Sequence, residues 1–394
     1  METSFSGRSR DEKGVPMIRH AEIAGAGFAG LVAAIALAQR GWTVRVHERS
    51  SSVRAEGFGI TLHPNGLKVL EALGVLETVL QGAMRVLRQD RYNDRGEIAA
   101  TFPVKQTYRV SRHHLISVLE SKARSLSVEI QTSSPAVAAT GNGELILKDG
   151  QRLKADLVVG ADGYLSQVRD SLGLLQKRVW LKDGAMRMII PRSDAEPIYD
   201  PATGAPSSEF WSGTRRIIYS PCSPGEVYIA MTCLIEDEAA KAAPIDPNIW
   251  RQSFPMRGDL IDRIVANTDW GSVKYVPFQV IHLKQWSTGR VAIVGDAANA
   301  MPPNLGQGGG VAMMNAWALA VALDEPMPVE EALRYWERRE RSLTDHTQRW
   351  SRLYSSATLW PPALRAIAFK AVERNAWVRS RYHRTANAVP AGWS

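Results

Sequence analysis

The sequence is poor in cysteine and has no long hydrophobic run. Only Cys222 and Cys233 occur among its 394 residues, which argues against a disulfide-rich scaffold and favours a reducing compartment. No apolar stretch approaches the roughly 18 residues typical of a membrane-spanning helix, and Met1–Gly14 lacks the apolar core of a signal peptide. We therefore predict a cytoplasmic protein with no membrane association and a disordered leader over residues 1–14.

Concentrated charge is also missing. The net charge is +8 and the pI is near 9.5, but the 48 Lys and Arg residues are dispersed among 40 Asp and Glu residues. Nucleic-acid-binding proteins gather their basic residues on one face or along one helix, so no nucleic-acid partner is predicted. We interpret the excess of positive charge as a solvated surface that also attracts anionic substrates. No metal site is predicted.

The sequence does contain a complete dinucleotide-binding unit over residues 18–48. A strand ending at Ala24 leads into a G-x-G-x-x-G motif, and a helix over Ala29–Arg40 and a strand over Thr43–His47 follow. Because the motif stands between a strand and a helix, it predicts a phosphate-binding turn rather than an ordinary glycine turn.

Each glycine of the motif has a separate physical role. Gly25 permits the tight turn, Gly27 allows the backbone to approach a pyrophosphate, and Gly30 lets the helix pack closely on the strand. Phosphates bind at the helix N-terminus, where free N–H groups and the helix dipole favour negative charge. Glu48 follows at close to the spacing of about 20 residues at which an acid binds ribose hydroxyls. Arg49 leaves a second interpretation open, since an arginine here could bind the 2′-phosphate of NADP.

Further helices and strands are predicted between the motif and residue 175 from apolar spacing and turn residues. They are a helix over Asn65–Leu73, short strands between Val86 and Tyr108, a helix over Val110–Leu126 capped by Ser111, a three-stranded antiparallel insert (Val128–Ile130, Ala136–Ala139 and Glu144–Leu147), and a buried strand over Leu157–Val159 that leads into Gly160–Gly163.

Residues 176–284 differ in composition, with more proline and tryptophan. They predict a mixed sheet with strands over Ala185–Ile190, Ile217–Tyr219, Val227–Ile235 and Tyr275–Leu283, together with a helix over Asn248–Ala266. After them we expect a buried strand from Val291, a loop rich in proline and glycine, a helix over Gly308–Leu323, an amphipathic helix over Val329–Ser342 and a helical tail.

Two residues of these segments have alternative interpretations. Arg112 lies in the first turn of a predicted helix, where a cation is unfavourable for the helix dipole, so it is either solvated or faces an anion. His63 stands before a Pro-Asn turn, where it is either a catalytic base or a packed or capping residue.

Three segments stand in order along the chain. They are the glycine motif that begins at Gly25, the G-A-D-G segment at Gly160–Gly163, and the G-D-A-A…P-P-N-L-G-Q-G segment that begins at Gly295. Together they resemble the fingerprints of the single-component, FAD-dependent aromatic monooxygenases, the para-hydroxybenzoate hydroxylase family. The resemblance extends from about Ile18 to about Arg341, and three ordered motifs are more specific than any one of them.

The resemblance implies an α/β fold in which a Rossmann-like FAD-binding domain is combined with a mixed β-sheet substrate domain and a C-terminal helical region. We expect the FAD-binding domain over residues 17–85, 105–175 and 285–325, the substrate domain over 86–104 and 176–284, and the helical region over 326–394. The protein is expected to be a monomer or a homodimer.

The resemblance also implies which residues hold FAD. Glu48 would bind the adenosine ribose, Asp296 would bind the ribityl chain, and Asp162 would brace the dinucleotide loops near the path of the nicotinamide cofactor. The segment Leu305–Gly309 would lie along the isoalloxazine, and the following helix N-terminus would stabilise negative charge on the reduced ring. Besides these residues and the motif glycines, the expected FAD-binding set contains Phe28, Ala29, Arg49, Arg54, Arg112, Val137, Pro303, Leu305, Gly306, Gln307, Gly308 and Gly309.

The implied reaction is the oxygenation of a small aromatic acid of the hydroxypyridine or hydroxybenzoate carboxylate class. NADH or NADPH would bind transiently and reduce FAD. O2 would then add at the flavin C4a, and one or both oxygen atoms would enter the electron-rich ring. Arg187 and Arg216 would clamp the substrate carboxylate, Tyr228 would bind its ring hydroxyl, and Pro302 would border the oxygen-reacting face. The alternative for the two arginines is structural, with each paired to a nearby acid.

Several segments are most similar to oxygenases of hydroxypyridine carboxylates, but the segment Arg85–Tyr92 departs from them and leaves the exact substrate open. Three other functions fit these motifs. A flavin halogenase would show a W-x-W-x-I signature, which this sequence lacks. A flavin reductase or dehydrogenase would transfer no oxygen, and a non-catalytic FAD-binding partner protein would show no turnover.

Overall fold

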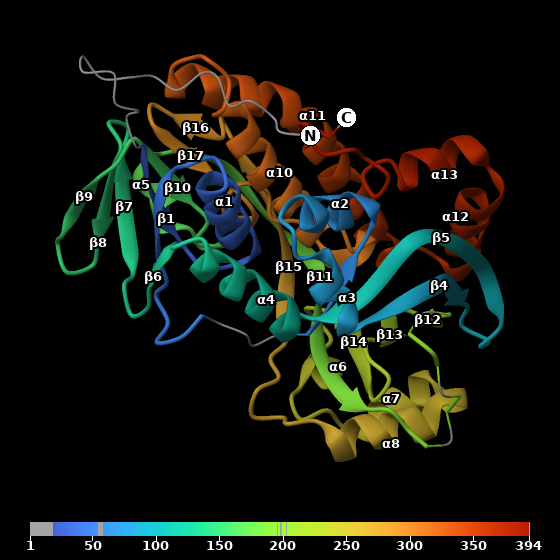
Figure 1. Ribbon diagram of the computed structural model, residues 1–394. Coiled ribbons are helices and arrows are strands. Elements are labelled where there is room, and N and C mark those ends of the chain that lie inside the picture. The colour runs from blue at the N-terminus through green and yellow to red at the C-terminus, as the bar shows by residue number, and fades with distance from the viewer. Residues whose placement is uncertain (1–18, 54–57, 195, 198, 202, 394) are drawn as a thin grey trace, which may run out of the picture.

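The computed structural model describes residues 19–53, 58–194, 196–197, 199–201 and 203–393. A six-stranded sheet, an eight-stranded sheet, a smaller three-stranded sheet and a set of C-terminal helices make up the structure (Figure 1). This arrangement confirms the predicted α/β fold, whereas the predicted domain boundaries stay predictions. The predicted leader over residues 1–14 and the predicted FAD contact Arg54 lie outside the described residues.

The first sheet has the strand order β16-β17-β10-β1-β2-β6, and all of its strands run parallel except β16. The register pairs Ala24 with both His47 and Gly160, so β1, β2 and β10 end beside one another at one edge of the sheet. Ligands of parallel α/β sheets bind at this carboxyl edge. The strands are β1 (His20–Ala24), β2 (Thr43–His47), β6 (Glu129–Gln131), β10 (Leu157–Gly160), β16 (Ser287–Thr288) and β17 (Val291–Ile293).

Helix α1 lies at the centre of the first layer and contacts the sheet, α4 and α10. Its residues 29–37 are all buried, because alanine and glycine in the helix let its neighbours approach closely. The predicted cap Ser111 is confirmed at the start of α4, where its Oγ accepts the N–H of His114 at 3.2 Å. The helices of this part are α1 (Phe28–Ala38), α2 (Pro64–Ala72), α3 (Leu76–Gln81), α4 (Arg112–Ser125), α5 (Gln167–Ser171), α9 (Asp296–Asn299) and α10 (Gly308–Ala322).

The small antiparallel sheet differs from the prediction in one strand. It consists of β7 (Ala136–Thr140), β8 (Glu144–Leu147) and β9 (Arg152–Lys154), at the end of the molecule away from α12 and α13 in Figure 1. The strand predicted at Val128–Ile130 belongs instead to the first sheet, where Ile130 pairs with Val46 in parallel register. The prediction was wrong because this long-range pairing extends the buried sheet, which the neighbouring hairpin turns do not reveal.

The second sheet has the order β15-β11-β14-β13-β12-β4-β5-β3. One of its faces forms an apolar core with α6, α7 and α8, which include the buried Trp250 and Ile261. β3 and β12 were not predicted, and β11 is far longer than the predicted strand Ala185–Ile190. The strands are β3 (Gly59–Leu62), β4 (Ala83–Tyr92), β5 (Ile98–Ser111), β11 (Leu175–Pro191), β12 (Ala205–Ser212), β13 (Arg215–Pro221), β14 (Glu226–Leu234) and β15 (Val276–Leu283).

The single helix predicted over Asn248–Ala266 is wrong. The chain forms α7 (Pro247–Ser253), a 3-10 turn η1 (Pro255–Arg257) and α8 (Gly258–Asn267), and the short α6 (Glu238–Lys241) precedes them. Pro255 interrupts the helix because proline has no N–H to donate and its ring clashes with the preceding turn.

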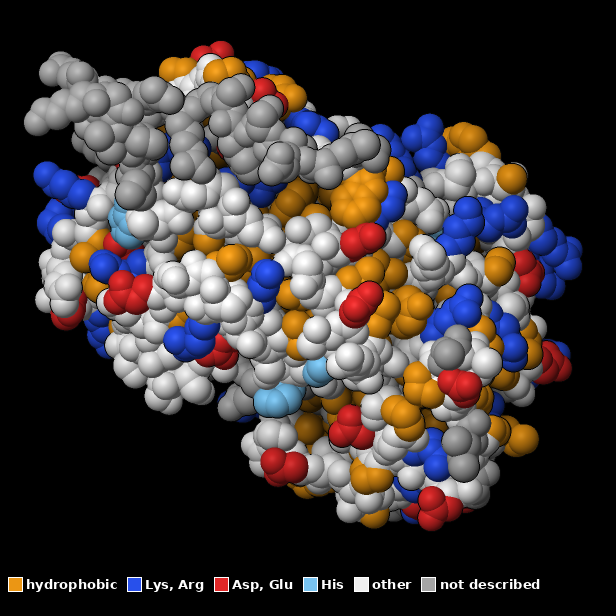
Figure 2. All heavy atoms as spheres, in the orientation of Figure 1, with side chains coloured by type: hydrophobic (Ala, Val, Ile, Leu, Met, Phe, Trp, Pro, Cys, Tyr) orange, Lys and Arg blue, Asp and Glu red, His pale blue; other side chains and the backbone are white. Residues whose placement is uncertain are grey.

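Long helices complete the C-terminal part. The predicted helix at Val329–Ser342 extends to Ser356 as α11 (Val329–Ser356), followed by η3 (Ala357–Leu359), α12 (Pro362–Arg374) and α13 (Ala376–Tyr382). Aromatic side chains of α11 and α12 pack against Phe102 and Trp211 of the second sheet. Figure 2 shows Lys and Arg side chains interspersed with Asp and Glu over most of this face and more frequent on the side where α12 and α13 lie. No helix among the described residues is long and apolar enough to cross a bilayer.

The two large sheets meet at the carboxyl edge of the first. The N–H of Ile281 in β15 donates to the carbonyl of Ala300, which follows α9, at 3.1 Å. Gln348 of α11 donates to the carbonyls of both residues, at 2.8 and 3.1 Å. These bonds hold the loop that contains η2 (Pro303–Leu305) against the second sheet, so both sheets contribute to one site.

Candidate active site

The N-terminus of α1 forms a tight cradle in which glycine is required. Gly25 has φ +100°, and a Cβ there would lie 2.5 Å from the carbonyl oxygen of Ala161. A Cβ on Gly30 would lie 1.9 Å from the carbonyl oxygen of Gly25. Gly27, by contrast, has no described atom within 4 Å of its Cβ position. The free N–H groups at the start of α1 therefore face open space, as an anion-binding helix N-terminus requires.

Glu48 lies at the end of β2 with only 8% of its surface exposed. Its Oε2 accepts the N–H of Ala26 at 3.1 Å, and its Oε1 accepts the N–H of Ser50 at 3.0 Å. These backbone bonds orient the carboxylate beside the α1 cradle. Since each carboxylate oxygen accepts more than one hydrogen bond, capacity remains for the hydroxyls of a ribose.

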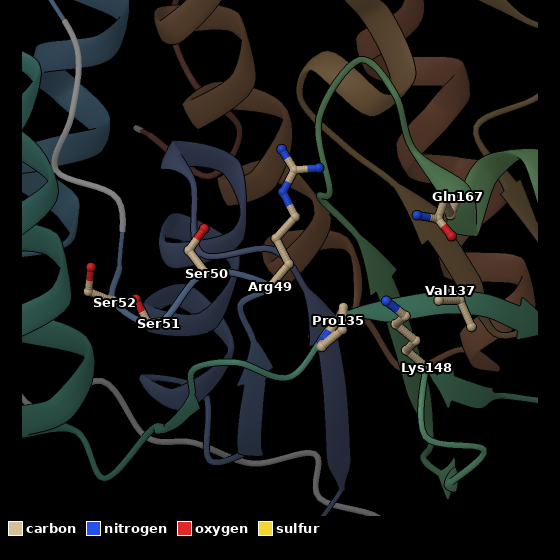
Figure 3. A pocket seen from close by; sticks show the side chains of 8 residues that line it. All are labelled: Arg49, Ser50, Ser51, Ser52, Pro135, Val137, Lys148 and Gln167. Atoms are coloured by element: carbon tan, nitrogen blue, oxygen red, sulfur yellow. The ribbon is translucent and has the colours of Figure 1, made fainter. Parts of the chain in front are cut away.

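A cavity of about 590 Å³ opens next to Glu48, a volume typical of small-molecule sites. Figure 3 shows residues from the loop after β2, from β7 and just before it, from just after β8 and from the start of α5 around it. The cavity brings together the predicted cofactor contacts Arg49 and Val137, and it adds Lys148 and Gln167, which were not predicted. The complete lining is Arg49, Ser50, Ser51, Ser52, Pro135, Val137, Lys148 and Gln167.

Asp162 fixes the loop between β10 and α5. Its Oδ2 accepts the N–H groups of Gln167 and Val168, at 2.8 and 3.2 Å. Its Oδ1 is buried and has no hydrogen-bond partner among the described residues. Burial raises the pKa of Asp162 above its ordinary value, and hydrogen bonds from Ser166 and the backbone act in the opposite direction.

Asp296 and Arg112 are close enough for the charge of each to shift the pKa of the other. The residue Asp296 is exposed. Nearby protein atoms nevertheless desolvate its carboxylate and raise its pKa, and the positive charges of Arg112 and Arg187 oppose this shift. The guanidinium of Arg112 lies 4.8 Å from the ring centroid of Phe28, the first residue of α1. Its Nε is buried and has no hydrogen-bond partner among the described residues. A cation beside a helix N-terminus, with its Nε free of a hydrogen bond among the described residues, fits the pyrophosphate of FAD. This favours the interpretation in which Arg112 faces an anion.

The glycine-rich loop continues from this point toward the second sheet. Gly306 has φ +63°, and a Cβ on Gly309 would lie 2.6 Å from Cδ1 of Ile60 in β3. Gly308 begins α10 and has no described atom within 4 Å of its Cβ position, so the first N–H groups of α10 are accessible. Gln307 is buried, and its Oε1 accepts a hydrogen bond from Asn65 at 3.1 Å. The predicted contacts Pro303, Leu305 and Gly306 line a second cavity, and Pro302 directly precedes them.

This second cavity lies between the loop and the second sheet. It contains all three predicted substrate contacts, Arg187, Arg216 and Tyr228. It also contains charged residues that were not predicted, namely Arg91, Arg109 and Glu209. Apolar side chains such as Ile218 and Phe278 complete the wall.

Two of the buried arginines of the second cavity form a network with Glu209. Arg91 and Arg216 each pair with it, at 2.9 and 3.1 Å, and the hydroxyl of Tyr354 donates to it at 2.9 Å. Arg216 also donates to Oδ1 of Asn304 in the glycine-rich loop, at 2.7 Å. The only trace of this network in the sequence is the presence of charged residues within otherwise apolar strands. The sequence does not show which strands are neighbours, so it could not predict the network.

His63 lies beside the loop and is a poor candidate for the catalytic base. Its side chain is buried, and burial, with smaller contributions from His383 and Arg109, lowers its pKa to about 3. A general base is most effective when its pKa lies near the working pH. Nδ1 of His63 lies 3.2 Å from Oγ1 of Thr107, which fits the packed role predicted as the alternative.

The buried neutral His63 is expected to make the protein less stable in acid. Unfolded histidine has a pKa of about 6.5, so between that value and about pH 3 the unfolded chain binds a proton that the folded chain does not. Stability is therefore lost as the pH falls below 6.5, by about 2 kcal/mol at pH 5 from this residue. Denaturant unfolding at pH 7 and pH 5 should show a smaller pH effect in His63→Asn. The same substitution at the exposed His113 should leave the pH effect as in the parent chain, and equal pH effects in all three proteins would contradict the expectation.

The comparisons with known proteins agree with this geometry. A family model described as an FAD binding domain matches residues 20–341. A relative from Rhodococcus erythropolis, provisionally named a 2-heptyl-3-hydroxy-4(1H)-quinolone synthase, is 38% identical over 95% of this chain and 97% of its own length. The 3-amino-4-hydroxybenzoate 2-monooxygenase of Streptomyces cremeus is 30% identical over 80% of this chain and 81% of its own. A solved tetrameric form of 2-methyl-3-hydroxypyridine-5-carboxylic acid oxygenase has a TM-score of 0.82 at 38% identity, and it covers 94% of this chain and 96% of that chain.

These matches span both the cofactor cradle and the second cavity. The roles predicted for individual residues stay predictions, but FAD as the cofactor and oxygenation as the class of reaction are confirmed. The chain belongs to the family of FAD-dependent aromatic monooxygenases.

Proposed function

We propose that the chain takes electrons from NADH or NADPH and oxygenates a small aromatic acid of the hydroxypyridine or hydroxybenzoate carboxylate class. The observation that supports this substrate class is the charge of the second cavity, which four arginines and a single acid line. Because charge is poorly screened in a largely buried space, this excess of positive charge favours an anionic ring over a neutral one. The lining charges are Arg91, Arg109, Arg187, Arg216 and Glu209.

Bound FAD supplies the redox chemistry that transfers oxygen to the ring, and the chain binds, orients and shields that ring. Tyr228 lines the wall of the cavity, and in this proposal its hydroxyl binds the ring hydroxyl of the substrate. Ile218, Ala230 and Phe278 provide an apolar surface that excludes water from the reacting face. The N-terminus of α10 favours negative charge on the reduced cofactor.

The names of two relatives support the two kinds of ring acid in the proposed substrate class. The solved oxygenase is named for a hydroxypyridine carboxylic acid, and the Streptomyces cremeus enzyme is named for an amino-hydroxybenzoate. The Rhodococcus erythropolis relative is named for an alkylquinolone instead. The excess of arginine in the cavity favours the acids, and a direct comparison of both classes decides between them.

The proposal is tested by NAD(P)H oxidation under ¹⁸O2 with a panel of substrates. The panel contains 2-methyl-3-hydroxypyridine-5-carboxylate, 3-hydroxybenzoate, 3-amino-4-hydroxybenzoate and an alkyl-4-quinolone. We expect an acid to accelerate NADH or NADPH oxidation and to acquire the label. No acceleration by any acid would contradict the substrate class, and acceleration without label would point to a reductase. The ratio of kcat/KM for NADH and NADPH measures the preference between them.

The assembly of the chain is a separate prediction. The sequence favours a monomer or a homodimer, whereas the solved hydroxypyridine oxygenase is described as a tetrameric form. Size-exclusion chromatography with light scattering measures the mass directly.

A further inference from the structure

Arg216, one of the two predicted carboxylate clamps, is already engaged by the protein. Its Nη1 pairs with Glu209 at 3.1 Å, and its Nη2 donates to Oγ1 of Thr232 at 3.3 Å and to Oδ1 of Asn304 at 2.7 Å. Its side chain is 2% exposed. Only Nε lacks a hydrogen-bond partner among the described residues. Since both terminal nitrogens are used and Glu209 supplies the opposite charge, Arg216 presents no free fork to a substrate carboxylate.

Arg109 on β5 lines the same cavity and shows the opposite pattern. Within the described part of the chain its one hydrogen bond runs from Nε to Oγ of Ser220 at 3.3 Å, and no carboxylate pairs with it. The residue is 9% exposed, so its charge is largely removed from water. A buried cation without a counter-charge is unfavourable, and an anion in the cavity would remove that penalty.

The surroundings of Arg109 hold its guanidinium in one place. The guanidinium lies 4.8 Å from the ring centroid of Tyr228, in cation–π contact. On the other side, a Cβ on Gly59 would lie 3.2 Å from Cδ of Arg109 and 2.9 Å from Cβ of Tyr228. Glycine at this position therefore makes room for the arginine and tyrosine together. Tyr228 is the residue predicted to bind the ring hydroxyl, so Arg109 stands next to the expected position of the ring.

Arg187 is the other cation of the cavity without a carboxylate in ion-pair contact among the described residues. Its charge lowers the pKa of Asp296, which desolvation raises more strongly. The same charge adds to the effect of burial in lowering the pKa of Arg112. Arg187 on β11 pairs in register with Ala230, two residues from Tyr228 on β14, so its side chain shares a face of the sheet with this tyrosine. Arg109 reaches the same tyrosine from β5.

We propose that Arg109 binds the anionic group of the substrate and that Arg216 is a positioning residue, which holds Asn304 in the loop over Pro303–Leu305. The assignment rests on the anionic substrate proposed above. It replaces the predicted pair Arg187 and Arg216 with Arg109, assisted by Arg187 from the neighbouring strand β11. Arg216 then links the second sheet to the loop that borders the cofactor.

The assignment is tested with benzoate and benzamide, which share a ring and differ in charge. Isothermal titration of the FAD-loaded enzyme gives their Kd values without any need for turnover. Arg109→Met should raise the Kd of benzoate about 30-fold, because a charge-assisted hydrogen bond is lost, and should leave the Kd of benzamide within about threefold. Arg109→Lys should recover part of the benzoate affinity. The control is Arg88→Met, since Arg88 is half-exposed on the neighbouring β4 and pairs with Asp90 at 3.0 Å.

Arg216→Met should leave the Kd of benzoate within about threefold and change the absorbance spectrum of the bound flavin, because Asn304 loses its anchor. Among the variants, an unchanged benzoate Kd in Arg109→Met would overturn the assignment, and so would a rise in Arg216→Met as large as in Arg109→Met. A parent enzyme that binds benzoate no more tightly than benzamide would also overturn it. An absence of ¹⁸O label in the panel, with benzoate selectivity intact, would instead contradict only the proposed function.

Discussion

Replacing Gly30 with alanine is expected to abolish FAD binding and to cost more than about 3 kcal/mol of unfolding free energy. The new Cβ would lie 1.9 Å from the carbonyl oxygen of Gly25, far inside van der Waals contact. The carbonyl belongs to the backbone just after β1, and the backbone of α1 fixes the position of the Cβ, so no side-chain rotation relieves the clash. Either α1 moves away from the strand or the turn at Gly25, with φ +100°, is lost.

Two matched glycine-to-alanine changes separate packing from cofactor binding. Gly27→Ala has no described atom within 4 Å of its new Cβ, so the apoprotein should lose no more than about 1 kcal/mol. Its affinity for FAD should still fall about 100-fold, because the methyl group occupies the approach of the pyrophosphate. Gly258→Ala, also without a described atom within 4 Å, lies at the start of α8 and should change neither quantity.

The measurements are urea unfolding of the three apoproteins and titration of each with FAD, followed by flavin fluorescence. Equal loss of stability in Gly27→Ala and Gly30→Ala would show that the close contact of Gly30 does not decide the packing of α1. Parent-like FAD affinity in Gly27→Ala would show that the pyrophosphate binds elsewhere.

The cradle was predictable from sequence because its determinants are local. Gly25, Gly30 and Glu48 follow one another through a strand, a turn, a helix and a second strand, and each has a conformational or steric requirement that leaves a sequence signature. The cap at Ser111 was predictable for the same reason. In each case the interacting residues lie within one continuous segment of the chain.

The second cavity was predictable only in part because its determinants are distant in sequence. Arg91, Glu209 and Tyr354 meet only after β4, β12 and α11 come together. β12 was not predicted, so the acid that neutralises Arg216 was not recognised. Arg109 was missed because it lies three residues before Arg112 in a segment rich in basic residues. An arginine in such a segment is usually exposed to solvent, and the sequence does not show that Arg109 is buried.

Glu209→Gln is expected to cost about 3–5 kcal/mol of unfolding free energy, the range for breaking a buried ion pair. Glu209 pairs with both Arg91 and Arg216, and the side chains of all three residues are 5% exposed or less. Burial alone would lower the pKa of Arg91, but Glu209 and Tyr354 raise it above its ordinary value. A guanidinium group is not deprotonated in a protein, so removing the carboxylate leaves two buried cations without compensation.

The control for this change is Glu120→Gln, which breaks the exposed i,i+4 pair with Arg124 on α4 and should cost no more than about 0.5 kcal/mol. In the double variant Arg91→Met/Glu209→Gln, one cation leaves with the acid, so the loss should be smaller than the sum of the two single losses by at least about 1 kcal/mol. Urea unfolding measures all four proteins. A cost below about 1 kcal/mol for Glu209→Gln would mean that water or the rearranged sheet compensates the arginines.

Glu209 also bears on which arginine binds the substrate. While its carboxylate occupies Nη1 of Arg216, that guanidinium is neutralised, and Arg109 remains the cation beside Tyr228 without a carboxylate partner among the described residues. In Glu209→Gln, Arg216 regains an uncompensated charge within the same cavity. Benzoate should then bind more tightly than to the parent enzyme, and Arg109→Met should weaken it less in the Glu209→Gln background. Unchanged benzoate affinity in Glu209→Gln would show that the positioning bonds to Thr232 and Asn304 are sufficient to keep Arg216 from the substrate.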